Sequence, residues 1–182
     1  MAVWNVISAQ TVDGSNPTSV TFSSIPDTYD HLYILASTRL SNTGSHAYYP
    51  NIVTSFNNST SGTEYNYSYL WAFNTTITGL IAQNQSNGLY GIRGSGTSSV
   101  ADIFTPTEIW IPNYSNTDNY KTSVFTSITS NNSSTDGHWL HQWGGWQWAN
   151  TAAISEIDFL PESSGTFAQY STFTLYGING AA

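Results

Sequence analysis

The chain has 182 residues, of which 15% are aromatic and only 8% are charged. Its 11 acidic and 3 basic residues give a formal net charge of −8. It therefore lacks the basic residues that a nucleic-acid groove or a patch for an anionic membrane requires. It has no cysteine and no run of about 20 apolar residues that could cross a membrane as a helix.

Short stretches in which apolar and polar residues alternate follow one another along the chain, and clusters of Gly, Asn, Ser and Asp separate them. No stretch has the spacing of a long amphipathic helix. The expected strands lie within residues 19–25, 31–38, 65–73, 107–112, 122–129, 153–160 and 171–178. The pattern predicts an all-β fold, an antiparallel β-sandwich that is jelly-roll-like, as a single domain over residues 1–182.

A glycine-rich stretch, GIRGSG, occupies Gly91–Gly96. It lacks the Lys-Ser/Thr pair of a phosphate-binding P-loop, and no helical pattern follows it. We therefore expect a turn between two strands here and no phosphate site.

The stretch HWLHQWGGWQW, at His138–Trp148, holds four of the seven tryptophans and two of the four histidines. Its Gly144-Gly145 pair is typical of a two-residue β-hairpin turn, which would place Trp143 opposite Trp146. Alternate residues of such a ribbon share one face. The face that we expect to bind a partner holds Trp139, His141, Trp143, Trp146 and Trp148.

Two interpretations of this aromatic face remain open. It is a buried core or subunit-interface surface, because Trp side chains bury large areas and anchor contacts. Alternatively, it is an exposed platform on which the rings of a host surface glycan stack. We favour the core or interface, because large exposed apolar patches are uncommon on soluble monomers.

The two histidines of this stretch, His138 and His141, have an HxxH spacing. Residues three apart on a strand point to opposite faces, so these two side chains cannot share an ion there. No cysteine and no acidic cluster completes a ligand set. We therefore expect no metal site and no cofactor.

Two carboxylates lie close together in the segment SEID, at Glu156 and Asp158. Paired carboxylates carry out glycoside hydrolysis. The simpler interpretation is that both lie on the solvent-facing side of a strand, while Ile154, Ile157 and Phe159 face the core. We favour the simpler interpretation and expect no catalytic residues.

Three segments carry a family resemblance. Residues Phe22–Ile34 read FSSIPDTYDHLYI, Ile109–Thr122 read IWIPNYSNTDNYKT, and Trp148–Ile178 end in STFTLYGI. They resemble the motifs of a family of virion structural proteins of tailed bacteriophages, with IPxTYxHL near the start and SxFxLYGI at the end. The likeness covers most of the chain outside residues 42–96. We also expect Tyr29 to pack at the edge of the core and Gly177 to mark a bulge or a close backbone approach.

The resemblance implies a non-enzymatic β-sandwich with no established catalytic residues. We expect a capsid decoration or cement protein on the outer surface of the virion head, bound to the major capsid protein as a homotrimer. The first ten residues lack the features of a signal peptide, which fits assembly in the host cytoplasm. The alternatives are a tail fibre or receptor-binding module for host surface glycans and, last, a depolymerase using Glu156 and Asp158.

Overall fold

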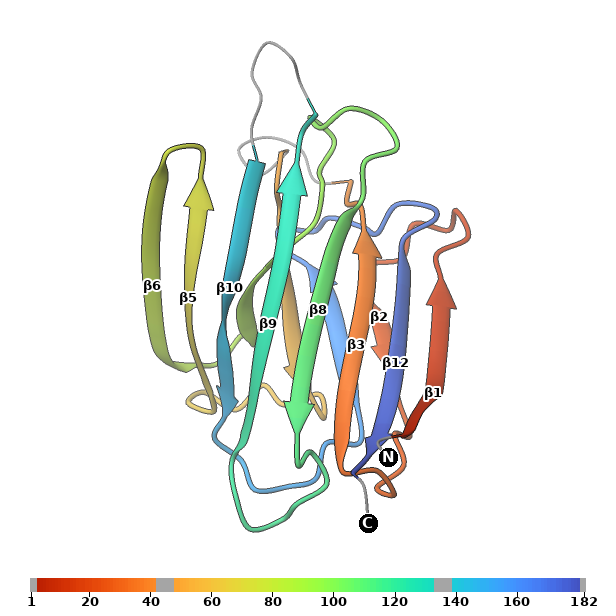
Figure 1. Ribbon diagram of the computed structural model, residues 1–182, viewed down its shortest axis with the longest axis vertical. Coiled ribbons are helices and arrows are strands. Elements are labelled where there is room, and N and C mark those ends of the chain that lie inside the picture. Colours follow the sequence, from red (N-terminus) through yellow and green to blue (C-terminus); the bar gives the residue numbers. More distant parts are fainter. Residues whose placement is uncertain (1–2, 42–47, 133–138, 181–182) are drawn as a thin grey trace.

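The computed structural model describes residues 3–41, 48–132 and 139–180, which form two antiparallel β-sheets that face each other (Figure 1). The larger sheet has the strand order β1 (Val3–Thr11), β12 (Thr172–Asn179), β3 (His31–Thr38), β8 (Thr105–Pro112), β9 (Lys121–Ser130), β10 (Trp139–Trp148), β5 (Tyr65–Phe73) and β6 (Thr76–Gln85). The smaller sheet has the order β2 (Val20–Phe22), β11 (Ile157–Pro161), β4 (Asn51–Phe56) and β7 (Leu89–Arg93). The predicted all-β, sandwich-like fold is confirmed.

The described residues form no helix, so none that is long and apolar enough to cross a membrane occurs among them. Each of the seven stretches expected as strands contains one. They correspond to β2, β3, β5, β8, β9, β11 and β12. Strands β4, β6 and β7 lie in the middle of the chain, outside the predicted stretches.

The period-two pattern decides which side chains enter the core. In β8, Ile109 and Ile111 are each 1% exposed. The alternating residues Glu108 and Trp110 face away from the small sheet. The two sheets meet in one hydrophobic cluster, in which the ring of Phe159 from β11 lies 5.2 Å from that of Phe173 in β12. The core is therefore built from alternate residues of both sheets.

The three resemblance segments interlock at one end of the sandwich. The Tyr114 hydroxyl donates a hydrogen bond to the backbone oxygen of Pro26, and Ser115 Oγ donates one to that of Tyr29 at 3.5 Å. A Cβ on Gly177 would lie 2.4 Å from the Tyr29 ring. The expected close approach at Gly177 and the packing of Tyr29 at the core are both confirmed. These motif residues explain how the segments pack.

The glycine-rich stretch at Gly91–Gly96 was wrongly predicted to be a turn. Its first three residues end strand β7, which pairs with β4. Gly91 has a φ of +123°, and a Cβ there would lie 2.3 Å from Phe125 Cζ. Glycine is required at this point because the β7 backbone passes directly over a core ring.

Candidate functional site

The tryptophan-rich stretch is one continuous strand, so the predicted hairpin at Gly144-Gly145 is wrong. Strand β10 runs from Trp139 to Trp148 without a turn, between β9 and β5. A Cβ on Gly144 would lie 2.3 Å from the backbone oxygen of Ser68 and 2.5 Å from Tyr69 Cβ. The glycine therefore marks a close approach of β5.

A continuous strand divides the predicted aromatic face into two. Trp139, His141 and Trp143 lie on the outer face of the large sheet, where they pair in register with β9 and β5 residues of that face. Trp146 and Trp148 point inward and are 3% and 1% exposed. Residues 143 and 146 are an odd number of positions apart, so without a turn they cannot share a face. The expected surface loses two of its five members to the core.

Both inward tryptophans satisfy their indole N–H groups. Trp146 Nε1 donates to the Tyr90 carbonyl at 2.7 Å, and its ring stacks on Phe125 with centroids 4.8 Å apart. Trp148 Nε1 donates to Glu64 Oε2 at 3.0 Å. Buried polar groups that find such partners avoid the cost of desolvation. Trp146 and Trp148 thus have the surroundings of core residues.

Glu64 connects the buried tryptophan to two neighbouring loops. Its carboxylate accepts hydrogen bonds from Ser59 Oγ at 2.6 Å, Trp148 Nε1 at 3.0 Å and Asn150 Nδ2 at 3.1 Å. Burial raises the pKa of Glu64, but the hydrogen bonds from Ser59, Trp148 and Asn150 outweigh it and lower the pKa below its usual value.

We expect Glu64→Gln to remove part of the acid sensitivity of the fold. The folded-state pKa of Glu64 lies below the unfolded value of about 4.3. Its ionised form therefore adds stability above that pH, and this stability is lost as the pH falls through the folded pKa. Urea unfolding between about pH 6 and pH 3 should show the variant less stable at neutral pH and the two curves converging in acid. A constant offset at every pH would contradict this, and Glu156→Gln is the control.

The outward residues of β10 form an aromatic surface. Trp139 is 47% exposed, and the rings of His141 and Trp143 lie 4.8 Å apart. His141 Nε2 is 3.0 Å from Thr126 Oγ1 on β9. Among the described residues no group of three metal-ligating side chains occurs. His138, the other half of the HxxH spacing, lies outside the described residues.

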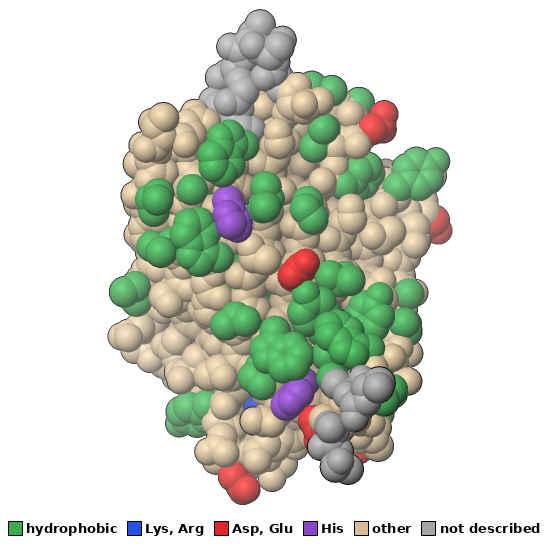
Figure 2. Space-filling model, in the orientation of Figure 1, with side chains coloured by type: hydrophobic (Ala, Val, Ile, Leu, Met, Phe, Trp, Pro, Cys, Tyr) green, Lys and Arg blue, Asp and Glu red, His purple; other side chains and the backbone are tan. Residues whose placement is uncertain are grey.

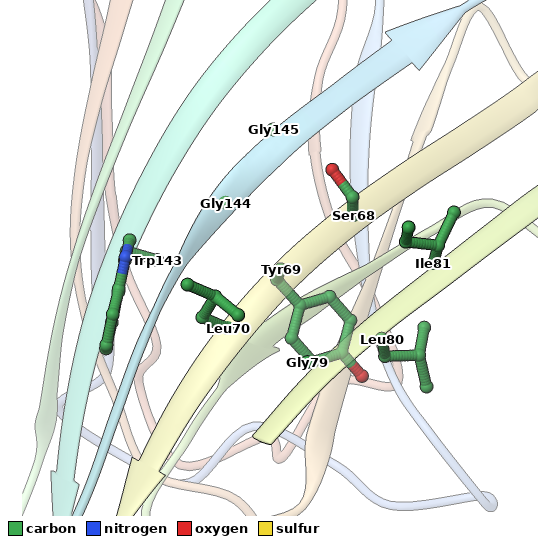
Figure 3. Close-up of a pocket in the computed structure, with 9 residues that line it drawn as sticks. All are labelled: Ser68, Tyr69, Leu70, Gly79, Leu80, Ile81, Trp143, Gly144 and Gly145. Atoms are coloured by element: carbon green, nitrogen blue, oxygen red, sulfur yellow. The ribbon is translucent and has the colours of Figure 1, made fainter. Parts of the chain in front are cut away.

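A groove of about 680 Å³ runs beside Trp143 on the outer face. Figure 3 shows Trp143, Leu70 and Ile81 rising from the adjacent strands β10, β5 and β6 around it. The surface is hollow here because Gly145 and Gly79, which lie on this outer face, contribute no side chains. The full lining is Ser68, Tyr69, Leu70, Gly79, Leu80, Ile81, Trp143, Gly144 and Gly145.

Sequence reasoning missed a second aromatic group on the same face, over β1, β3, β8 and β12. The Trp4 ring lies 5.0 Å from Tyr33 and 5.9 Å from Tyr176, and Trp110 lies 6.3 Å from Tyr33. Figure 2 shows hydrophobic side chains gathered in two regions of this face. A signal was present, because the alternation in TEIWIP places Trp110 on the face opposite Ile109 and Ile111.

Charge is sparse between the two aromatic groups. Glu108 Oε2 accepts a hydrogen bond from the Tyr33 hydroxyl at 2.7 Å. Burial, together with this hydrogen bond and the charge of Glu108, raises the pKa of Tyr33 to about 12. The phenol therefore remains a neutral donor throughout the physiological range.

The two carboxylates of SEID do not form a pair in one pocket. Ile157 and Phe159 face the core as expected, and Asp158 lies on the opposite face of β11. Asp158 is nevertheless only 7% exposed, so the expectation of a solvent-facing side chain is wrong there. It lines a pocket with serine, threonine and asparagine residues, and Glu156 is not among them. This pocket therefore contains only one of the two carboxylates that glycoside hydrolysis would need.

No protein-family model matches the chain, and no curated protein matches it significantly.

Proposed function

We propose that the protein is a non-enzymatic structural protein of a tailed-bacteriophage virion, a decoration or cement protein on the outer surface of the capsid. In this proposal it binds the major capsid protein as a homotrimer and assembles in the host cytoplasm. The resemblance of its three motif segments supports the family, and their interlocking contacts are consistent with motifs that specify a fold.

The main observation in support of the proposal is the exposed apolar surface on the outer face of the large sheet. The small sheet packs against its inner face, whereas the outer face exposes aromatic and aliphatic side chains from one edge to the other. These include Trp4, Val6, Leu35, Val124, Ile128, Trp139, Leu70, Ile77 and Ile81. Exposed apolar surface on this scale is typical of a protein-binding surface. A capsid shell is a partner that covers such a face permanently.

The edges of the large sheet support association between copies. Edge strand β1 has nine residues and edge strand β6 has ten, and neither contains a charged residue or proline. Monomeric proteins usually protect such edges with charges, prolines or bulges. Only one irregularity interrupts each of the two edge pairings, at Val6/Ser8 and Tyr65/Tyr67. Pairing of β1 with β6 of a second copy would join sheets head to tail, and three copies can close a ring.

We expect the double variant Ile77→Lys/Ile81→Lys to dissociate the trimer. These side chains are 69% and 77% exposed on β6, so the lysines should leave the fold intact while opposing edge pairing. Light scattering after size exclusion should give three times the 19.9 kDa chain mass for the wild type and one chain mass for the variant. Val100→Lys, at a 47% exposed loop position, is the control. A monomeric wild type at high concentration would refute the proposed trimer.

Localisation on the native particle tests the function itself. An antibody raised against this chain should label the heads of phage particles that contain the protein. A cryo-EM map of these particles should show its density on the outer surface of the head. Label confined to the tail or to fibre tips would overturn the decoration proposal.

The groove beside Trp143 favours a second candidate, a tail-fibre or receptor-binding module for host glycans. It combines an aromatic wall with the polar side chain of Ser68 in a concave surface, and such combinations bind small ligands. This candidate predicts tail localisation and loss of host-polysaccharide binding in Trp143→Ala. Intrinsic fluorescence that stays unchanged on addition of host polysaccharide would count against it.

A further inference from the structure

The outer face of the small sheet holds a second and more polar concavity. It has a volume of about 560 Å³, within the range of small-molecule sites. Strands β2, β4 and β11 form its floor, and the loops after β4 and before β7 form its walls. Its lining consists of Ser19, Thr21, Ser55, Asn58, Ser59, Thr60, Ser86, Asn87, Asp158 and Leu160.

Asp158 lies in the floor of this pocket. It is on the central strand of the three, directly opposite Thr21 on β2 and Ser55 on β4. Its Oδ1 accepts a hydrogen bond from Thr21 Oγ1 at 2.6 Å. Its Oδ2 is buried, and no described residue donates a hydrogen bond to it. A buried carboxylate oxygen without a donor is costly, so a rotation of the Asp158 carboxylate that lets a ligand in the pocket donate to it would relieve this cost.

The wall of the pocket is held in place before any ligand binds. Ser59 Oγ donates to Glu64 at 2.6 Å, and the Tyr65 hydroxyl donates to the Ser59 carbonyl at 3.0 Å. Asn57, two residues before Ser59, accepts hydrogen bonds at its Oδ1 from the backbone N–H groups of Ser155 and Glu156 at 2.8 and 3.0 Å. A pre-organised wall lowers the entropy cost of binding.

The chemistry of the lining selects an uncharged ligand rich in hydroxyl groups. No lysine, arginine or histidine lines the pocket, and Asp158 is its one carboxylate, so an anion would find no opposite charge there and would be repelled by Asp158. A single carboxylate also falls short of the ligand set of a divalent cation. Serine and threonine hydroxyls and asparagine amides both donate and accept hydrogen bonds, as sugar hydroxyls do. Leu160, which is 39% exposed, offers an apolar contact for the C–H face of a ring.

We propose that this pocket binds a short neutral saccharide, with the Asp158 carboxylate accepting hydrogen bonds from its hydroxyl groups. The pocket lies on the small sheet, whereas the Trp143 groove lies on the large sheet. Saccharide binding to the pocket is therefore a separate proposal from the location of the protein on the virion. It goes beyond the proposed decoration role, since a decoration protein needs no glycan site.

The test is an array of neutral, sulfated and sialylated oligosaccharides, followed by calorimetric titration of the tightest neutral binder. Asp158→Asn preserves the shape of the side chain and removes its charge, and should weaken binding about tenfold or more. Asn87→Trp, at an exposed rim position, should block the pocket without touching the core. Trp143→Ala should leave this binding unchanged.

The outcomes separate the proposals. Loss of binding in Asp158→Asn and Asn87→Trp, with binding retained in Trp143→Ala, would establish the pocket whether the protein is found on the head or on the tail. Undiminished binding in both pocket variants, absence of any neutral glycan binding in the wild type, or a preference for sulfated or sialylated glycans would overturn it.

Discussion

Replacing Trp148 with alanine should lower the free energy of unfolding by about 3–5 kcal/mol, whereas Trp139→Ala should lower it by less than about 1 kcal/mol. Trp148 is 1% exposed, and its ring lies 5.8 Å from that of Phe56. Its loss leaves a cavity and also deprives Glu64 of an indole donor. Trp139 is 47% exposed on the outer face, so its truncation removes little buried area.

Urea unfolding followed by far-UV circular dichroism measures both variants on a common scale. The comparison separates the two halves of the tryptophan-rich strand. Similar losses of stability in both variants would contradict the division of β10 into an inner and an outer face. For attachment to assembled particles, the relative size of the two effects should reverse. Trp139→Ala should weaken attachment if the outer face of the large sheet is the docking surface, and a folded Trp148 variant should not.

Gly144→Ala should be strongly destabilising, with a loss of about 3 kcal/mol, while Gly145→Ala should cost less than about 1 kcal/mol. A methyl group at residue 144 would lie 2.3 Å from the Ser68 backbone oxygen, and backbone atoms cannot move aside as a flexible side chain can. At residue 145 the nearest atom is the Ser123 backbone oxygen at 3.3 Å. The two positions are neighbours in one strand, so each is the natural control for the other.

The same pair of variants distinguishes a continuous strand from a hairpin. In a type I′ hairpin turn both central residues take positive φ, so both substitutions would be costly. In the continuous strand only the approach of β5 at residue 144 matters. Equal destabilisation by the two substitutions, measured by urea unfolding, would therefore favour a type I′ hairpin and contradict the pairing of β10 with β5.

The fold class followed from local pattern because strand alternation is a local property. In β8 and β12 the residues that alternate in the sequence are those that enter the core, so the sheets could be predicted without knowing their partners. The same local pattern correctly placed Ile157 and Phe159 inside. The alternation in β8 also places Trp110 on the outer face, opposite Ile109 and Ile111.

The candidate sites depended on information that lies far away in the sequence. Asp158 becomes a buried floor residue because Thr21, which is 137 positions away, and the loop after β4 surround it. Neither contact is visible in the segment SEID. The assignment of Trp146 and Trp148 likewise depended on whether the chain turns at Gly144, and this is decided by β5.

The sequence by itself therefore determined seven of the strands, the core-facing residues in several of them, such as β8 and β12, and the low charge on which the expectation of no nucleic-acid or anionic-membrane partner rests. Only the tertiary structure decided the strand order, the meaning of the glycine pair and the position of the polar pocket. The physical reason is that side-chain alternation is set by neighbours in the chain. A glycine with no room for a Cβ, or a carboxylate enclosed by other strands, is set by neighbours in space.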